Sequence, residues 1–310
     1  MSQQIRFHIP DFLKHFSLNM HLLQMMQQKP EAFRENITIG SVFGVFPTAL
    51  WNGGRFLQGN CDTRVMQEIL KAFNQQGVPC RFTFTNPLID ERHLQDSFCN
   101  SLLRMAENGL NEVIVTSPVL EQYIRENYPA YPIISSTCKE LTDPAALAEE
   151  LEKDYKLVVL DYRHNNHWEV LSRITRPEKC EILVNACCDP ACTRRTAHYR
   201  CIGKSQLQYA KWAKTAKPGA PVPPLEVQKF TCPYMTLSLY DTVGFSTHVT
   251  PEALYEKYVP AGFVNFKLEG RSLPDVNVLE SYVYYMVKPQ WQDRIRLELL
   301  LRLTRKYKYF

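Results

Sequence analysis

Short β-rich apolar runs alternate along the chain with stretches of helical spacing. The runs that predict strands are 37–46, 80–85, 112–116, 132–135, 157–161, 180–186 and 262–268. Predicted helices lie at 62–75, 90–107, 120–126, 144–153, 168–174, 276–286 and 293–306. Continuous apolar strands that alternate with helices are typical of a parallel sheet covered on both faces. The pattern therefore predicts an α/β protein with a (β/α)8 TIM-barrel-like fold rather than a doubly wound sheet.

Both ends of the chain carry helical patterns outside this alternation. Residues 7–26 have apolar positions near helical spacing and predict a helical lead-in. At the other end, Ile295, Leu299 and Leu303 share one face of a basic amphipathic helix that should pack on the barrel or mediate dimerisation. We therefore expect one barrel domain over 1–290 and a C-terminal helix over 291–310. One of the eight strands is missing from the pattern, and we expect it between 186 and 262.

Composition narrows the class of protein. The chain has 310 residues, 45% of them hydrophobic, which excludes a disordered chain. Its 36 Lys and Arg against 32 Asp and Glu give a formal charge of +4, far from a polybasic composition. The N-terminus has no signal pattern, and no apolar run reaches the roughly 20 residues of a membrane span. We expect a cytoplasmic protein without a membrane partner, with its ten cysteines reduced or metal-bound.

Polar residues follow several predicted strands, where a parallel barrel places its reactive side chains. The segment Trp51-Asn52-Gly53-Gly54-Arg55 combines paired glycines, which permit a close backbone approach, with a guanidinium suited to carboxylate or phosphate. A tight turn with a surface arginine is the alternative. The predicted substrate-binding residues are Trp51, Asn52, Arg55, Asn86, Asp161 and Asn185.

The segment after the sixth predicted strand carries the strongest chemical pattern. Asp189 is a good N-cap and Pro190 a good first helical residue, so a helix should begin there. Cys192 would then lie in the first turn, where the helix dipole favours a thiolate. Arg195 and His198 follow at steps of three on the same face, and we predict both as catalytic.

Several cysteines near this helix could bind a metal. Cys188 lies four residues before Cys192, and Cys232 precedes a proline, as cluster ligands often do. The fourth ligand could be Cys201, Cys187 or Cys61, with Cys201 as our choice. These spacings are too open for a zinc ribbon, whereas an iron–sulfur cluster tolerates them. A 4Fe–4S cluster is therefore the predicted cofactor, with zinc as the alternative metal. The alternative without a metal is a set of ordinary buried cysteines.

Two further patterns indicate an anionic ligand. Alternation along the last predicted strand places Lys267, Glu269 and Arg271 on one face at the barrel mouth, where they could act in catalysis or form a salt bridge. The stretch 190–225 contains no Asp or Glu but several Arg and Lys, including Lys204, Lys211 and Lys214. It is either a solvated basic face or a rim that attracts anions such as a small substrate or RNA.

The sequence Gly-Phe-x-x-Phe-Lys-Leu-Glu-Gly-Arg at 262–271, after the pair Cys188-x-x-x-Cys192, resembles the U32 peptidase superfamily. The resemblance implies a TIM-barrel-like domain. Several members of this superfamily carry a 4Fe–4S cluster bound by four cysteines, which supports oxygen-independent hydroxylation of ubiquinone precursors, tRNA or rRNA. The resemblance implies that this chain could carry such a cluster. The chain lacks the Cys-x-x-x-x-x-Ser-Gly-x-Cys and Asn-Arg-Gly-x-Cys elements of the family, which indicates a divergent branch.

These patterns together predict an iron–sulfur barrel enzyme that performs hydroxylation or other redox chemistry on an anionic substrate. An electron donor, a homo-oligomer or another protein partner would be compatible with this function. The alternatives are a hydrolase that uses Cys192 with His198 or a metal-bound water, and an RNA-associated protein. The predicted cluster ligands are Cys188, Cys192, Cys201 and Cys232, and the predicted catalytic residues are His198, Arg195, Lys267, Glu269 and Arg271.

Overall fold

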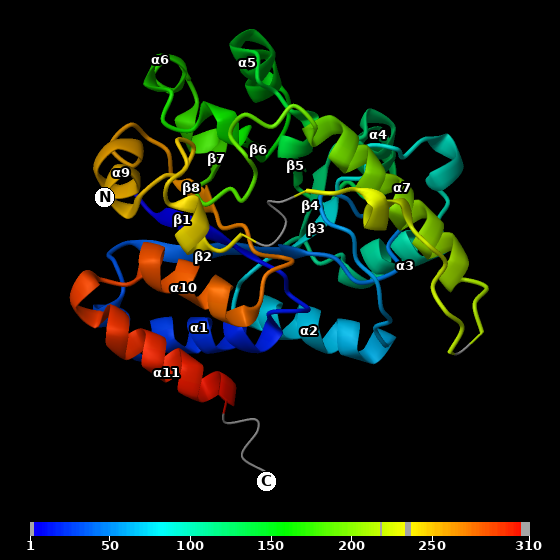
Figure 1. Ribbon diagram of the computed structural model, residues 1–310, viewed down its shortest axis with the longest axis horizontal. Helices are drawn as coiled ribbons and strands as arrows, with labels where there is room; N and C mark the ends of the chain where they lie inside the picture. Colours follow the sequence, from blue (N-terminus) through cyan, green and yellow to red (C-terminus); the bar gives the residue numbers. More distant parts are fainter. Residues whose placement is uncertain (1–2, 218, 233–236, 305–310) are drawn as a thin grey trace. The chain divides into compact units, whose positions relative to one another are not determined.

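A computed structural model describes residues 3–217, 219–232 and 237–304 of the chain. Its strands form a closed parallel barrel in which neighbouring strands follow chain order (Figure 1). They are β1 Ile5–Pro10, β2 Ile37–Gly44, β3 Cys80–Phe84, β4 Glu112–Val115, β5 Ile133–Ser135, β6 Leu157–Val159, β7 Cys180–Leu183 and β8 Asn265–Lys267. The predicted (β/α)8 TIM-barrel-like fold, with helices added at both ends, is confirmed.

Helices alternate with these strands. The α-helices are α1 Phe16–Gln28, α2 Thr63–Gln75, α3 Ser97–Ala106, α4 Pro118–Asn127, α5 Pro144–Glu152, α6 Trp168–Leu171, α7 Arg195–Ala213, α8 Leu239–Thr242, α9 Pro251–Ala253, α10 Asp275–Met286 and α11 Gln292–Thr304. The 3-10 turns are η1 Pro30–Ala32, η2 Glu91–His93, η3 Thr137–Lys139, η4 Tyr162–His164, η5 Pro177–Lys179, η6 Glu226–Lys229 and η8 Pro289–Trp291, and η7 Leu254–Tyr258 is a π-helix.

The strand missing from the sequence pattern is β1. The prediction of a helical lead-in over 7–26 was wrong for its first residues, and no described segment between β7 and β8 is a strand. Ile5, Phe7 and Ile9 are buried in β1, and Phe7 lies opposite Phe266 of β8. Only a short segment separates this strand from α1. The helical spacing of apolar residues in the longer α1 therefore obscures the alternation of apolar and polar residues in β1.

Helix α7 begins later than predicted. Its N-cap is Arg194, so Cys192 lies in the preceding loop and not in the first helical turn. Hydrogen bonds hold the start of this loop: the backbone N–H of Cys187 donates to the Glu269 carboxylate at 2.9 Å, and the Tyr162 hydroxyl donates to the carbonyl of Asp189 at 2.8 Å. Because Glu269 and Tyr162 hold the backbone of Cys187 and Asp189 in a non-helical conformation, no helix begins directly after Pro190.

The chain divides into two compact units, each built from separate segments. The first unit contains residues 1–42, 162–190 and 234–310, and the second contains 43–161 and 191–233. Strands β1, β7 and β8 belong to the first unit, and β3 to β6 belong to the second, together with α7.

In the first unit, α11 packs against α1 and α10 (Figure 1). Ile295 and Leu299 of α11 are fully buried, whereas Arg296 on its polar face binds Glu280 at 2.8 Å. The amphipathic face thus packs within this unit, and basic residues of the helix make intramolecular ion pairs. The basic residues Arg305, Lys306 and Lys308 of the predicted C-terminal helix lie outside the described residues.

Buried charged networks lie at the strands of both units. In the first unit, Lys267 Nζ lies 3.1 Å from Glu181 Oε1. In the second, Arg81 Nε lies 2.8 Å from Glu112 Oε2, and Lys156 binds the same carboxylate. Burial alone would raise the pKa of Glu112, but the two cations outweigh it and hold this pKa below its ordinary value. Buried charges of this kind need such partners, because the cost of removing a single charge from water is several kcal/mol.

Among the described residues, no helix is both long enough and apolar enough to cross a lipid bilayer.

The glycine pair after β2 allows a close backbone approach within the protein itself. A Cβ on Gly53 would lie 2.3 Å from the carbonyl carbon and oxygen of Thr85. Its neighbour Gly54 has a φ of 73°, a left-handed conformation that favours glycine. The close approach expected for a ligand is thus made by the end of β3.

Replacing Gly53 should therefore destabilise the second unit. We expect Gly53→Ala to lower the free energy of unfolding by about 3 kcal/mol, because the added methyl group meets backbone atoms rather than a movable side chain. Urea denaturation monitored by circular dichroism measures this change. Gly244→Ala is the control, since nothing lies within 4 Å of its Cβ position, and it should change stability by less than about 0.5 kcal/mol. Equal effects of the two variants would contradict the packing argument.

Candidate functional site

A buried ion pair fixes the first turn of α7 in the second unit. Arg195 Nη1 donates to Asp161 Oδ2 at 2.7 Å, and the two residues are only 4% and 1% exposed. The same guanidinium donates from Nε to the Tyr199 hydroxyl at 2.9 Å and from Nη2 to Thr137 Oγ1 at 3.1 Å. Asp161 follows β6 and Thr137 follows β5, so the network ties α7 to the C-terminal ends of both strands.

Two members of this network, Arg195 and Tyr199, keep fixed protonation states. Burial by itself would lower the pKa of Arg195, but Tyr199 and Asp161 outweigh it, and the pKa lies above its ordinary value. Burial raises the pKa of Tyr199, which Arg195 opposes only in part. The guanidinium is therefore a permanent cation and the phenol is neutral, so both residues position the helix.

His198 is a neutral imidazole at the edge of this network. Its ring stacks on Phe230 with centroids 4.5 Å apart and planes 9° apart, and the guanidinium of Arg194 lies 4.5 Å from the centre of the Phe230 ring. Burial, followed by the charges of Arg55 and Arg194, lowers the pKa of His198 to about 4. No described residue hydrogen-bonds to the ring, so one ring N–H and one ring acceptor are available to a ligand.

Positive charge gathers around His198. Arg55 and Arg194 both act electrostatically on its imidazole, and Arg55 also acts on Tyr199. The carboxylate of Asp161 is neutralised by its pair with Arg195. The N-terminal end of a helix adds partial positive charge. The chemistry of this region therefore suits a carboxylate or a phosphate, which guanidinium groups bind with two parallel hydrogen bonds.

The structure brings some of the predicted catalytic and substrate-binding residues close together and leaves others apart. It places Arg55, Asp161, Arg195 and His198 in one region of the second unit. Tyr199, Thr137 and Phe230 belong to this region but were not predicted. Tyr199 could have been found from its spacing, because it lies four residues after Arg195 on the same helical face. Phe230 has no signal in the sequence, since it reaches His198 through a loop.

Three predicted substrate-binding residues are buried and hydrogen-bonded within the second unit. Trp51 Nε1 donates to the carbonyl of His93 at 2.9 Å. Asn52 Nδ2 donates to Gln206 Oε1 at 3.1 Å, and Asn86 Nδ2 donates to the carbonyl of Gly203 at 3.1 Å. Because Gly203 and Gln206 belong to α7, the two asparagines fasten this helix. Contact of Trp51, Asn52 and Asn86 with a substrate stays a prediction.

The remaining predicted substrate-binding and catalytic residues, Asn185, Lys267, Glu269 and Arg271, lie in the first unit. The backbone N–H of Glu269 donates to Asn185 Oδ1 at 2.7 Å, and the Glu269 carboxylate accepts from the backbone of Cys187. Lys267 is buried against Glu181 and Arg271 is 8% exposed. These residues link the ends of β7 and β8, and a catalytic role for Lys267, Glu269 and Arg271 stays a prediction, as does substrate binding by Asn185.

The predicted cluster ligands are half-buried thiols. Cys188 belongs to the first unit, whereas Cys192, Cys201 and Cys232 belong to the second. Within the described part of the chain, no three His, Cys, Asp or Glu side chains are grouped so that they could hold a metal ion. The residues therefore form no preassembled metal centre that fits the group, and the 4Fe–4S cluster, or zinc in its place, stays a prediction.

Comparison with solved structures finds a fold of the same kind. A solved structure of a U32 peptidase aligns with a TM-score of 0.51 over 88% of this chain and 96% of that chain, at 13% sequence identity. The chain has the fold of a U32 peptidase. The resemblance predicted from 262–271 and the cysteine pair is thus confirmed at the level of fold. No protein-family model matches the chain, and no curated protein matches it.

The charges around His198 predict its titration. We expect nuclear magnetic resonance of the imidazole to give a pKa of about 4, and Arg55→Gln to raise it by removing a nearby cation. The folded pKa lies below the unfolded value of about 6.5, so this group's contribution to stability is lost as the pH falls from about 6.5 towards 4. A wild-type pKa near 6.5, unchanged in the variant, would contradict the arrangement.

The Asp161–Arg195 pair predicts a large stability effect. We expect Arg195→Leu to lower the free energy of unfolding by about 3–5 kcal/mol, because it leaves a buried carboxylate without its partner. Chemical denaturation measures the loss. The double variant Arg195→Leu with Asp161→Leu should recover part of it, since no lone charge then remains. A single variant as stable as the wild type would show that the pair is not buried.

The cluster prediction is tested by iron content. After anaerobic purification, Cys188→Ala, Cys192→Ala and Cys232→Ala should each lose bound iron and sulfide, because each removes a thiolate ligand. Cys80→Ala is the control, since Cys80 is fully buried and burial raises the pKa of its thiol. Iron-free wild-type protein, or equal iron in all variants, would refute the cluster.

Proposed function

We propose that this chain is a U32-like barrel enzyme that binds an anionic substrate at the start of α7. Arg55 and Arg194 would bind the negative charge, and His198 would supply a neutral hydrogen-bonding group beside it. The observation that carries the proposal is the set of cations around an imidazole whose pKa is lowered to about 4. Arg195 and Asp161 would act as positioning residues.

The burial of the residues supports this division of roles. Arg195 is buried and its guanidinium is bound by Asp161, Tyr199 and Thr137, so it is committed to the protein. Arg194 is exposed, and its Nη1 donates to the carbonyl of Thr231 at 3.2 Å, which leaves further donors for a ligand. An anion beside Arg194 would gain charge-assisted hydrogen bonds there.

His198 can respond to such an anion. A neutral imidazole can donate one hydrogen bond and accept another. When an anion neutralises Arg55 and Arg194, the two cations stop opposing protonation, so the pKa of His198 rises. The site can thus take up a proton together with its ligand, and His198 could accept that proton from the substrate.

The geometry does not favour the hydrolase alternative. A Cys192–His198 pair would need a hydrogen bond between thiol and imidazole, and a thiolate would raise the pKa of the imidazole. Instead the pKa of His198 is lowered, and neither side chain hydrogen-bonds to a described residue. Iron–sulfur redox chemistry remains the reaction that the U32 resemblance predicts for the anionic substrate.

Binding of inorganic phosphate and of malonate tests the proposal. We expect each anion to shift the imidazole resonances of His198 and to raise its pKa towards 6. Arg55→Gln and Arg194→Gln should each weaken binding at least about tenfold, as expected for loss of a charge-assisted contact.

Lys211→Gln is the matched control, because Lys211 is an exposed cation on the same helix and forms no ion pair with a described residue. It should leave anion affinity within about twofold of wild type. The proposal fails if neither anion perturbs His198, or if Lys211→Gln weakens binding as much as Arg194→Gln does.

A further inference from the structure

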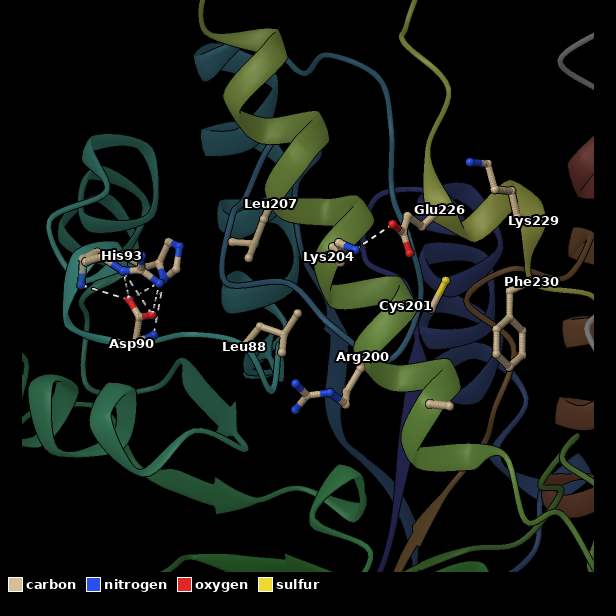
Figure 2. Close-up of a pocket in the computed structure, with 12 residues that line it drawn as sticks. Leu88, Asp90, His93, Arg200, Cys201, Lys204, Leu207, Glu226, Lys229 and Phe230 are labelled. Atoms are coloured by element: carbon tan, nitrogen blue, oxygen red, sulfur yellow. Dashed lines mark hydrogen bonds and ion pairs between the residues drawn. The ribbon is translucent and has the colours of Figure 1, made fainter.

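A cavity of about 860 Å³ lies along the outer face of α7 in the second unit (Figure 2). Its floor is the helix itself, with the loop after β3 on one side and the segment around η6 on the other. We call this feature the α7 groove. Its lining includes Leu88, Arg200, Lys204, Leu207, Lys229 and Phe230.

The groove uses the face of α7 opposite the positioning network. Ala197, Arg200, Lys204 and Leu207 follow one another at steps of three or four residues, so they share one helical face. Arg195, which faces the core, lies about half a helical turn away from this stripe. The groove is therefore a separate surface, joined to the candidate site through Phe230, which stacks on His198.

Apolar side chains line the groove at intervals. Leu88, Leu207 and Phe230 are each half-buried, so part of their apolar surface faces the cavity. Figure 2 shows the two leucines on one side of α7 and the phenylalanine on the other. Half-exposed apolar side chains in a concave surface are typical of a site that buries apolar groups of a ligand.

The groove also carries cations that form no close ion pair with the described residues, although Lys229 acts electrostatically on Glu226. Arg92 and Lys204 are paired with Asp90 and Glu226, both at 2.6 Å. Arg200 and Lys229, in contrast, are exposed and form no ion pair with a described residue. These two cations flank the apolar positions and give the groove a net positive charge.

We propose that the α7 groove docks an acidic segment of a partner protein that carries aliphatic side chains between its Asp and Glu residues. Clusters of cationic side chains recognise acidic peptide motifs, and apolar pockets between the cations select side chains within the motif. The carboxylates would pair with Arg200 and Lys229, and the aliphatic groups would cover Leu88 and Leu207.

A peptide fits the groove better than a nucleic acid does. Single-stranded nucleic acids bind on rows of aromatic side chains on which successive bases stack. The aromatic rings lining the groove are those of Phe230 and His93, and Phe230 is already stacked on His198. The carboxylates of Asp90 and Glu226 would also repel a continuous phosphate backbone, whereas a peptide can place uncharged residues beside them.

Fluorescence anisotropy with a labelled peptide of Glu-Glu-Leu repeats tests the docking. The wild-type protein should bind this peptide at least about tenfold more tightly than a Glu-Glu-Ser or Lys-Lys-Leu peptide of equal length. Arg200→Glu combined with Lys229→Glu should weaken binding at least about tenfold, and Leu207→Ser should do so without changing any charge. Lys211→Glu, an exposed charge reversal on the same helix, is the matched control and should change binding by less than about twofold.

Three results would overturn the proposal. They are equal binding of the Glu-Glu-Leu and Glu-Glu-Ser peptides, tighter binding of an oligothymidylate of matched charge, and a loss in Lys211→Glu equal to that of the double variant. Circular dichroism checks the fold of each variant, and both reversed cations are exposed. Phosphate binding next to His198 should persist in the double variant, so failure of the docking and failure of the anion site are distinguishable.

Discussion

The buried ion pair between Asp161 and Arg195 is the interaction on which the candidate site depends. Two charges with almost no exposure are stable only when each is paired and hydrogen-bonded. Tyr199 and Thr137 supply the further hydrogen bonds that the guanidinium requires. Because these partners come from α7 and from the segments that follow β5 and β6, the pair sets the position at which the helix begins. The placement of His198 one turn into α7 follows from this constraint.

Helix α7 then serves two surfaces of the second unit. Its inner face carries Arg195 and is held close to the strand ends, where a Cβ on Gly203 would lie 2.3 Å from Asn86 Oδ1. Its outer face forms the floor of the α7 groove. Between the two faces lies His198, whose pKa is lowered first by burial and then by the nearby cations. A single helix thus connects the positioning network with the proposed anion site and the proposed docking surface.

The sequence predicted the barrel because seven apolar strands and the helices between them carry strong periodicity. Most residues of β1 were predicted as part of a helix, because this strand of six residues lies just before α1 and the helical pattern of α1 obscured it. The sequence pattern also placed the start of α7 at Pro190, since local capping preferences do not include the long-range contacts of Tyr162 and Glu269 that hold the preceding loop. Local rules failed here because tertiary hydrogen bonds decide the backbone.

The site was predictable to the extent that the barrel topology fixes it. Asp161 was predicted because it follows a strand, and Arg195 and His198 because they follow Cys192 at steps of three residues. The stacking of Phe230 on His198 could not be predicted, because it depends on the path of a loop far along the chain. Burial likewise decided the state of the imidazole, and burial is a property of the packed unit rather than of neighbouring residues.

A crystal structure of the wild-type protein grown with phosphate tests the central claim most directly. The account predicts a phosphate bound by Arg55 and Arg194 beside the ring of His198, with Arg195 still paired to Asp161. A phosphate bound only by Arg200 and Lys229 would contradict this account of the site, as would a structure in which the anion draws Arg195 away from Asp161.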